Sequence, residues 1–194
     1  DTESGANGKK LFTRVDSAEQ GHNILAAIEK EHAAGFTPEV YWVTQRGDEK
    51  MNRRLALRPT SETAFYQMYN LWIKSYTDLP MKLYQSCTVF RNESETNPFM
   101  RGREFMWIET HDVFTDEKAA REQVKTDEKI IETVCKKLCL PFYFFKRPQW
   151  DTFPGAVETY ATDILLPDGK ALQFATTHYL GTNFSKAFNV KFKN

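Results

Sequence analysis

Two long stretches of alternating residues, with a loop between them, constrain the fold of this chain more than any other feature. Residues 81–93 and 103–114 both have the pattern of an extended strand, and residues 94–100 between them contain the turn-forming pair Asn97-Pro98. Consecutive strands joined by so short a connection pair antiparallel. The sequence therefore predicts a long hairpin with a loop at its tip.

A second hairpin and a long helix are predicted in the C-terminal half. Residues 157–166 and 170–176 alternate like strands, and Pro167-Asp168-Gly169 between them is a strong turn signal. Residues 116–138 carry apolar side chains at helical spacing on an otherwise charged surface. Because hairpins dominate, we expect an α+β fold in which helices flank an antiparallel β-sheet.

The N-terminal half is predicted to consist of shorter elements. Residues 1–16 have the composition of a flexible lead-in, and one domain is expected to cover residues 17–194. The elements expected at its start are a helix to about residue 34, a strand at 40–44, a polar turn at 46–54 and a short strand at 55–57. A helix begun by Thr60 or Ser61 is expected next, with Phe65, Met68, Tyr69 and Trp72 on one face.

Composition excludes several classes of protein. The 194 residues, 41% of them hydrophobic, suffice to bury one sizeable core. The 26 basic and 26 acidic residues balance, which argues against a non-specific nucleic-acid coat protein. No apolar run approaches the ~18 residues of a membrane span, so no membrane association is expected.

Three cysteines are too few and too irregular for a disulfide framework, and they favour a reducing compartment. Cys135 and Cys139 lie four residues apart on the predicted 116–138 helix. A metal site needs about four ligands, and no histidine is near this pair. We therefore expect two packed thiols and no protein metal site.

The two strands of the first hairpin carry an unusual mixture of side chains on one face. Alternation places Val89, Arg91 and Glu93 together on the first strand. On the second strand it groups Arg103, Phe105, Trp107, Glu109, His111 and Val113. Aromatic rings beside several fixed charges suit a concave site for a phosphorylated aromatic ligand. An amphipathic sheet edge with its charges paired is the alternative.

Several motifs in order along the chain carry a resemblance to a known family. Phe90-Arg91-Asn92-Glu93, a loop, and then Arg101 four residues before Phe105 resemble motif 2 of class II aminoacyl-tRNA synthetases. The surrounding sequence resembles prolyl-tRNA synthetases of the eukaryote/archaeal-like type over about residues 28–192. The stretches that carry this resemblance are 35–40, 57–63, 78–80, 103–111 and 178–186.

The resemblance implies a ligase of protein biosynthesis with a class II catalytic core. Such an enzyme activates proline with ATP to give prolyl-adenylate and pyrophosphate, and then transfers the prolyl group to the acceptor end of tRNA(Pro). It implies ATP as a substrate, Mg²⁺ accompanying the ATP, a homodimer as the usual state, and a cytoplasmic location. The chemistry needs positioning and charge stabilisation more than a protein nucleophile.

Residues of motif 2 are implied to be catalytic and ATP-binding. Arg91 matches the arginine that bridges the α-phosphate and the carboxylate of the amino acid, and Glu93 matches the residue near the adenine amino group. Arg101 matches the arginine that holds the γ-phosphate, and Phe105 matches the ring under adenine. From the residues alone, Arg91 could instead form an ion pair with Glu93, and Phe105 could be a core residue.

A second set of residues is implied to bind proline. Thr60 and Glu62 match the residues that hold the imino group, although they could also be an N-cap and a first-turn carboxylate. The residues matching the wall of the proline pocket are Trp107, Glu109, His111 and Phe153.

A late strand is implied to complete the site. Gln173 and Thr176 match residues that contact ATP, and His178 matches one that completes the proline pocket. Gln173 and Thr176 fall on opposite faces of a regular strand, so a bulge or a strand end is needed to bring them together.

The sequence also departs from the family. Motif 1 is expected before Gly35 and motif 3 after Phe192, and neither is seen. The anticodon-binding domain is not seen either. Residues 155–159 differ from the family's usual run at the pocket floor. We therefore expect an incomplete catalytic domain, a fragment with weak or absent activity on its own. The alternative is a synthetase-like module that binds a nucleotide or an amino acid without activating it.

Overall fold

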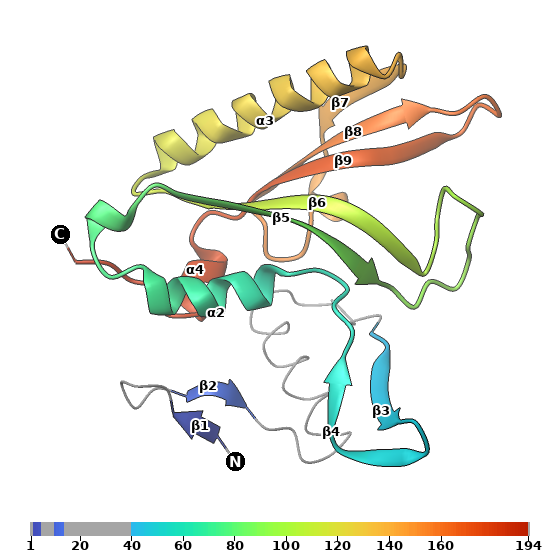
Figure 1. Ribbon diagram of the computed structural model, residues 1–194. Coiled ribbons are helices and arrows are strands. Elements are labelled where there is room, and N and C mark those ends of the chain that lie inside the picture. Colours follow the sequence, from blue (N-terminus) through green and yellow to red (C-terminus); the bar gives the residue numbers. More distant parts are fainter. Residues whose placement is uncertain (1, 5–9, 14–39, 194) are drawn as a thin grey trace. The chain divides into compact units, whose positions relative to one another are not determined.

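The computed structural model describes residues 2–4, 10–13 and 40–193 (Figure 1). The chain divides into two compact units. Among the described residues, unit 1 holds those up to Thr63 together with Gln85–Glu109, and unit 2 holds Ala64–Tyr84 and the residues from Thr110 onward. The helix predicted up to residue 34 and the domain start at residue 17 lie outside the described residues.

Unit 1 contains two small antiparallel sheets. β1 (Thr2–Ser4) pairs with β2 (Lys10–Thr13) inside the stretch expected to be a lead-in, and β3 (Trp42–Arg46) pairs with β4 (Glu49–Ala56). The polar turn predicted at 46–54 is wrong. The connection is Gly47-Asp48 alone, with Gly47 at φ +58°, where a glycine is favoured. Most described side chains of this hairpin are exposed, so no apolar alternation marks β4.

The long hairpin predicted from the sequence is confirmed. β5 (Met81–Phe90) and β6 (Glu104–Val113) form a two-stranded sheet, and the backbone N–H of Arg91 donates to the carbonyl of Arg103 at 2.9 Å. Asn97 and Arg101 exchange two backbone hydrogen bonds of 2.9 and 2.7 Å within the connecting loop. The register at the base of the loop is therefore fixed on both sides.

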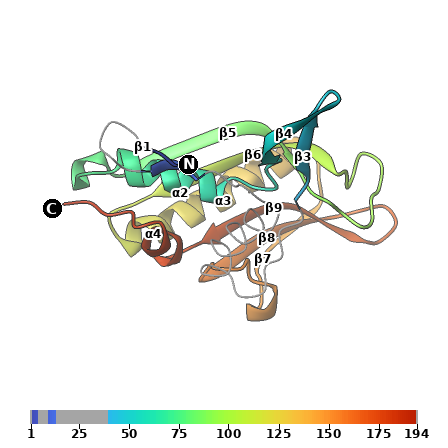
Figure 2. The same cartoon turned by 90° about the horizontal axis from the view of Figure 1, so that it is seen from below.

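Unit 2 is a three-stranded antiparallel sheet with a long helix packed on it (Figures 1 and 2). The strand order is β7 (Phe142–Lys146), β8 (Glu158–Leu165) and β9 (Ala171–Tyr179), which confirms the second predicted hairpin. The helix, α3 (Glu117–Lys137), begins after Asp116, whose carboxylate accepts from the N–H of Ala119 at 2.9 Å.

The core of unit 2 forms around α2 (Glu62–Trp72) and α4 (Asn183–Ala187). Its buried side chains are Tyr66, Tyr69, Ile73 and Phe184. The apolar face predicted for α2 is therefore wrong in part, because Met68 and Trp72 are exposed. The buried face is formed by residues 66, 69 and 73. Aromatic residues occur at every turn of the helix, so the sequence alone does not single out this spacing.

Two short 3₁₀ turns, Tyr76–Asp78 and Gln149–Asp151, complete the elements of unit 2. The expected pair of packed thiols is corrected, since Cys135 is buried whereas Cys139 lies beyond the end of α3 and is exposed. Within the described ranges, no helix combines the length and the apolar character that crossing a membrane requires.

Candidate functional site

In unit 1, Arg91 lies over the aromatic pair predicted to be its neighbours. Its guanidinium carbon is 5.4 Å from the ring centre of Phe105 and 5.1 Å from that of Trp107, and the two rings meet edge to face. Its Nε donates to the carbonyl of Pro59 at 3.1 Å. That bond orients the guanidinium against the two rings.

Glu93 and Arg101 form an ion pair at the base of the hairpin loop. Nε and Nη2 of Arg101 both donate to Oε2 of Glu93, at 3.1 and 2.7 Å, and only 13% of the Glu93 side chain is exposed. The alternative pairing of Glu93 with Arg91 is therefore wrong. Oε1 of Glu93 has no partner within the described residues, which leaves it able to accept a hydrogen bond from a ligand.

The residues expected to hold the imino group also contact each other. The Thr60 hydroxyl donates to the carboxylate of Glu62, the first residue of α2. The hydroxyl of Thr60 thus serves Glu62 and not a backbone N–H of the helix. A carboxylate in the first turn is favoured by the helix dipole, which agrees with the structural interpretation of Glu62, while its contact with proline stays a prediction.

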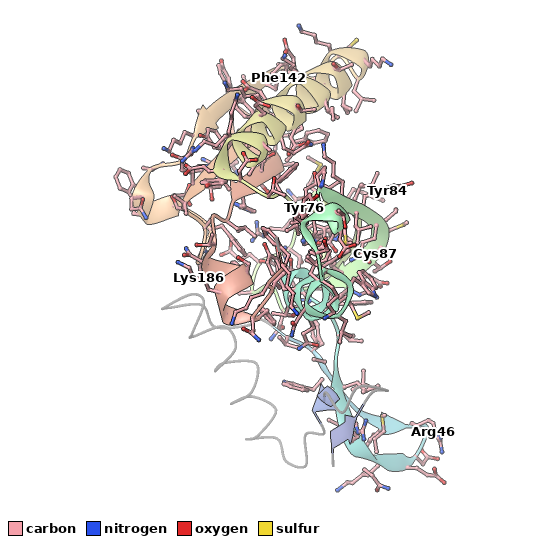
Figure 3. All side chains as sticks on the ribbon, turned by 90° about the vertical axis from the view of Figure 1, so that its left-hand side faces the viewer. Arg46, Tyr76, Tyr84, Cys87, Phe142 and Lys186 are labelled. Carbon is pink, nitrogen blue, oxygen red and sulfur yellow. The ribbon has the colours of Figure 1, made fainter. Side chains whose placement is uncertain are left out.

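Gln85 is a contact residue that the sequence interpretation missed. Its amide nitrogen donates to Glu109 at 2.5 Å and to Ser61 at 2.7 Å, and the thiol of Cys87 lies 3.6 Å from the same Glu109 oxygen. The labelled Cys87 lies on β5 (Figure 3). Stepping back from Arg91 by two residues at a time along β5 reaches Gln85, so the alternation that identified Arg91 also contained this residue.

The loop of the hairpin surrounds a shallow cavity. Phe99, in the left-handed region at φ +62°, has a fully exposed side chain. Gly102 fits its turn because a Cβ there would come within 3.0 Å of the carbonyl oxygen of Glu104. The residues that line the cavity are Thr96, Asn97, Pro98, Phe99, Arg101, Gly102 and Arg103.

In unit 2, Phe153 and His178 form the second part of the predicted site. Their ring centres lie 4.4 Å apart. Nδ1 of His178 is 2.9 Å from the hydroxyl of Thr159, and that hydroxyl also accepts from the backbone N–H of Phe153 at 2.9 Å. Burial lowers the pKa of His178 to about 4, because water no longer stabilises the charged ring. The imidazole is therefore neutral at pH 7.

The irregularity predicted on the late strand is present. Thr159 pairs with His178, Ala161 pairs with Thr176, and Asp163 pairs with Gln173, with a register shift between Thr162 and Asp163. Since residues 159, 161 and 163 alternate regularly on β8, their partners on β9 share one face. The bulge thus places Gln173, Thr176 and His178 on the same side of the sheet.

Arg147 connects Gln173 to the rest of this sheet. Its Nη2 donates to both carboxylate oxygens of Asp163, at 2.7 and 2.9 Å, and lies 3.4 Å from Oε1 of Gln173. The carbonyl oxygen of the Gln173 amide thus accepts from Arg147, and the NH₂ group of the same amide is able to donate to another acceptor. Sequence reasoning missed Arg147, because its partners are 16 and 26 residues away and only the strand register brings them together.

His111 has the surroundings of a structural residue. It is buried, and its ring stacks on that of Phe65 at 4.1 Å. The carbonyl of His111 accepts from the hydroxyl of Tyr69 at 2.6 Å, and burial raises the pKa of that hydroxyl. Its place in the wall of a proline pocket stays a prediction.

The run that departs from the family, residues 155–159, contains the main ion cluster of unit 2. Glu158 accepts from Lys146 at 2.6 Å, from Arg121 at 2.9 Å and from Tyr160 at 2.8 Å. These bonds, led by that from Lys146, lower the pKa of Glu158 to about 2. Glu158 therefore links α3 to the sheet.

The fold and these contacts define the class of the protein, and the comparisons with known proteins agree. The family model for the tRNA synthetase class II core domain (G, H, P, S and T) matches residues 41–194, and the chain belongs to this family.

Its relatives within the family are proline–tRNA ligases. That of Thermofilum pendens is 59% identical over 165 residues, covering 84% of this chain and 34% of the relative. That of Thermoplasma acidophilum is 46% identical over 185 residues, covering 95% and 40%. The chain thus spans about a third to two-fifths of the length of these relatives.

Solved structures give the same relationship. The chain aligns with a Giardia lamblia prolyl-tRNA synthetase in complex with prolyl-adenylate, with a TM-score of 0.79 and 39% identity over 86% of this chain and 34% of that one. It also aligns with a Cryptosporidium parvum prolyl-tRNA synthetase complexed with halofuginone and AMPPNP, with a TM-score of 0.77 and 38% identity over 81% and 33%. The resemblance and the α+β class inferred from the sequence are confirmed.

Proposed function

We propose that this chain carries catalytic residues of a proline–tRNA ligase, which activates proline with ATP and transfers it to tRNA(Pro). The observation that carries the proposal is the placement of Arg91 over Phe105 and Trp107. A delocalised cation held against two rings can bind a planar base and an anionic group at neighbouring positions. The proline–tRNA ligases related to the chain support the choice of reaction.

Adenylate formation joins two anions, and Arg91 is suited to that step. The proline carboxylate attacks the α-phosphorus of ATP, a new oxygen–phosphorus bond forms, and pyrophosphate leaves. The Nε of Arg91 donates to the carbonyl of Pro59, which orients the guanidinium, and a guanidinium can bridge the carboxylate and the α-phosphate as they approach. Phe105 provides the surface under adenine.

The ion pair beside Arg91 is proposed to hold the ends of ATP. Oε1 of Glu93 accepts the adenine amino group, and Arg101, 58% of whose side chain is exposed, turns toward the γ-phosphate. Gln173, whose amide carbonyl accepts from Arg147, presents its NH₂ to the nucleotide, with Thr176 on the same face.

Proline recognition is assigned to uncharged surfaces and to the carboxylates of Glu62 and Glu109. The secondary ammonium of proline has two donors, which Thr60 and Glu62 are proposed to accept. The residues proposed to surround the ring are Trp107, Glu109, His111, Phe153 and His178. The buried indole N–H of Trp107 finds no acceptor in the described part of the chain, so a ligand oxygen would satisfy it.

Mg²⁺ is proposed to be bound together with ATP. Magnesium in nucleotide sites is commonly held by substrate phosphates and one or two carboxylates, with water in the remaining positions. Residues 40–193 contain no group of three or more candidate metal ligands, so this chain fits a cation held mainly by phosphate oxygens. When bound, the ion would offset negative charge on the phosphates.

The remaining partners belong to the proposal as well. The acceptor end of tRNA(Pro) is assigned to the loop at residues 94–100, where Phe99 is exposed. A homodimer is proposed as the assembled state. The free thiols of Cys87, Cys135 and Cys139 support a reducing, cytoplasmic location.

Proline-dependent exchange of pyrophosphate into ATP tests the proposal in a ligase in which this chain replaces the matching residues of the Thermofilum pendens relative, since weak or absent activity is expected of the chain alone. We expect exchange with proline, much less with alanine or cysteine, and a loss of at least about 10³-fold in Arg91→Ala, because one arginine serves both reacting anions. Arg46→Ala is the matched control, since Arg46 is 84% exposed and pairs with its neighbour Glu49 at the tip of the β3–β4 hairpin (Figure 3).

The second candidate function is a binding module without ligase activity. The departure at residues 155–159 favours it, because the carboxylate of Glu158 there is bonded to Arg121 of α3 and to Lys146 of β7. Saturable binding of a non-hydrolysable prolyl-adenylate mimic without exchange would support this second function. The absence of both binding and exchange would contradict both candidate functions.

A further inference from the structure

Thr159 lies at the centre of the Phe153–His178 contact, although no site role was predicted for it. It is 3% exposed and lies directly across from His178 in the β8–β9 register. One oxygen, Oγ1 of Thr159, is 2.9 Å from the backbone nitrogen of Phe153 and 2.9 Å from Nδ1 of His178. The ring centres of Phe153 and His178 are 4.4 Å apart with their planes tilted by 30°, so the three residues form a closed triangle.

The direction of each hydrogen bond follows from the atoms involved. A backbone N–H can only donate, so Oγ1 of Thr159 accepts from Phe153. The hydroxyl proton of Thr159 then needs an acceptor, and the one that the described residues offer is Nδ1 of His178. The reverse arrangement would leave a buried hydroxyl proton unpaired, which is costly.

A ring that accepts at Nδ1 and is neutral carries its proton on Nε2. The low pKa of His178, about 4, agrees with a neutral ring at physiological pH. The free edge of the imidazole is then an uncharged hydrogen-bond donor.

We propose that Thr159 is a positioning residue that fixes His178 as the Nε2–H tautomer and holds the Phe153 backbone against it. The edge so presented suits an oxygen acceptor of the ligand, such as a carboxylate, carbonyl or phosphoryl oxygen. The identity of that ligand rests on the proposed function, whereas the tautomer does not.

The tautomer is measured by ¹⁵N NMR on protein with labelled histidine. The chain has four histidines, and His178→Gln identifies the signal that belongs to this ring. We expect an unprotonated Nδ1 and a protonated Nε2 in the wild type and in Thr159→Ser. A protonated Nδ1 in the wild type would overturn the proposal, whatever the protein's activity.

Kinetics separate positioning from plain structure. Thr159→Val, of nearly equal volume, removes the hydroxyl, and we expect a shifted Nδ1 signal with protonation spread over both nitrogens. The KM for proline should rise about tenfold with kcat nearly unchanged, as the loss of one oriented hydrogen bond predicts, and Thr159→Ser should restore it.

A Thr159→Val protein that is less stable but keeps the wild-type tautomer and KM would show that Thr159 only packs, and would contradict the proposal. If Thr159→Val does not fold, the wild-type spectrum and Thr159→Ser still decide the question. The expected tautomer without proline-dependent exchange would contradict the proposed function and support the role of Thr159.

Discussion

The two units carry their candidate site residues in different chemical surroundings. In unit 1 the key groups are charged, and one ion pair, Glu93 with Arg101, lies beside an arginine whose orientation comes from a backbone carbonyl. In unit 2 the residues Phe153, Thr176 and His178 carry no charge, and the charged groups, among them Glu158 and the Arg147–Asp163 pair, hold the framework.

This difference matches two tasks that one reaction requires. Phosphates and a carboxylate need fixed charges that are available to the ligand, whereas a pyrrolidine ring has no hydroxyl to recognise and needs a shaped apolar surface. Substitutions of the charged residues Arg91, Glu93 and Arg101 should therefore act mainly on the rate or on ATP, and substitutions of the uncharged residues Phe153 and His178 on proline affinity or on stability.

The largest effect that tests this comparison is expected at Arg101. Arg101→Ala removes the charge assigned to the γ-phosphate, and kcat/KM for ATP in the exchange assay should fall about 10²–10³-fold. The KM for proline should stay within about threefold, because no apolar surface is lost.

Arg46→Ala, which also removes an arginine paired with a glutamate, serves as the control and should leave both constants unchanged. An equal loss for ATP and proline in Arg101→Ala would contradict the division of tasks between the charged and the uncharged site residues.

A smaller effect, on folding, is expected at Arg147. Only 16% of the Arg147 side chain and 12% of the Asp163 side chain are exposed, so Arg147→Ala leaves a mostly buried carboxylate unpaired. The free energy of unfolding should fall by about 3 kcal/mol, measured by urea denaturation. Lys170→Ala, which breaks an exposed pair with Asp168, should change it by less than about 0.5 kcal/mol. Equal losses in the two variants would show that the Arg147 pair is not structural.

Local pattern was enough to predict much of the fold. α3 and both hairpins follow from periodicity, a cap and turn residues, and these signals lie within a few positions of each other. Arg91, Phe105 and Trp107 could be grouped because they alternate on adjacent strands. A bulge or a strand end was predicted near Gln173 and Thr176 because the family resemblance places both on one side, and the structure has the bulge.

Contacts between distant residues were the part that could not be predicted. The partnership of Glu93 with Arg101 instead of Arg91 depends on how the loop turns, and the links from Arg147 and Thr159 depend on the register of β7–β9. The side chains of β4 are mostly exposed, so its sequence shows no apolar alternation. α2 has aromatic residues on several faces, so only its packing against other elements determines which face is buried.

The smallest expected effect is on how the free energy of unfolding depends on pH, and it tests whether charged groups in unit 2 stabilise the fold. The pKa of Glu158 is about 2 in the folded protein against an ordinary value of 4.5, because Lys146, Tyr160 and Arg121 favour its charged form. A lowered carboxyl pKa stabilises the fold above about pH 4.5, and this stabilisation is lost as the pH falls from about 4.5 to about 2. After screening by solvent, we expect about 1 kcal/mol.

Chemical denaturation of the wild type and Glu158→Gln between pH 7 and pH 2 measures this contribution as the difference between the two curves. That difference should be largest at neutral pH and vanish near pH 2. Glu132→Gln, which alters a more exposed pair with Lys136 on α3, should follow the wild-type curve closely. If Glu158→Gln also follows it, the cluster contributes no net stability. The departure from the family at residues 155–159 would then need an explanation in ligand binding. The contrast between unit 1, whose charged groups are available to a ligand, and unit 2, whose charged groups stabilise the fold, would fail.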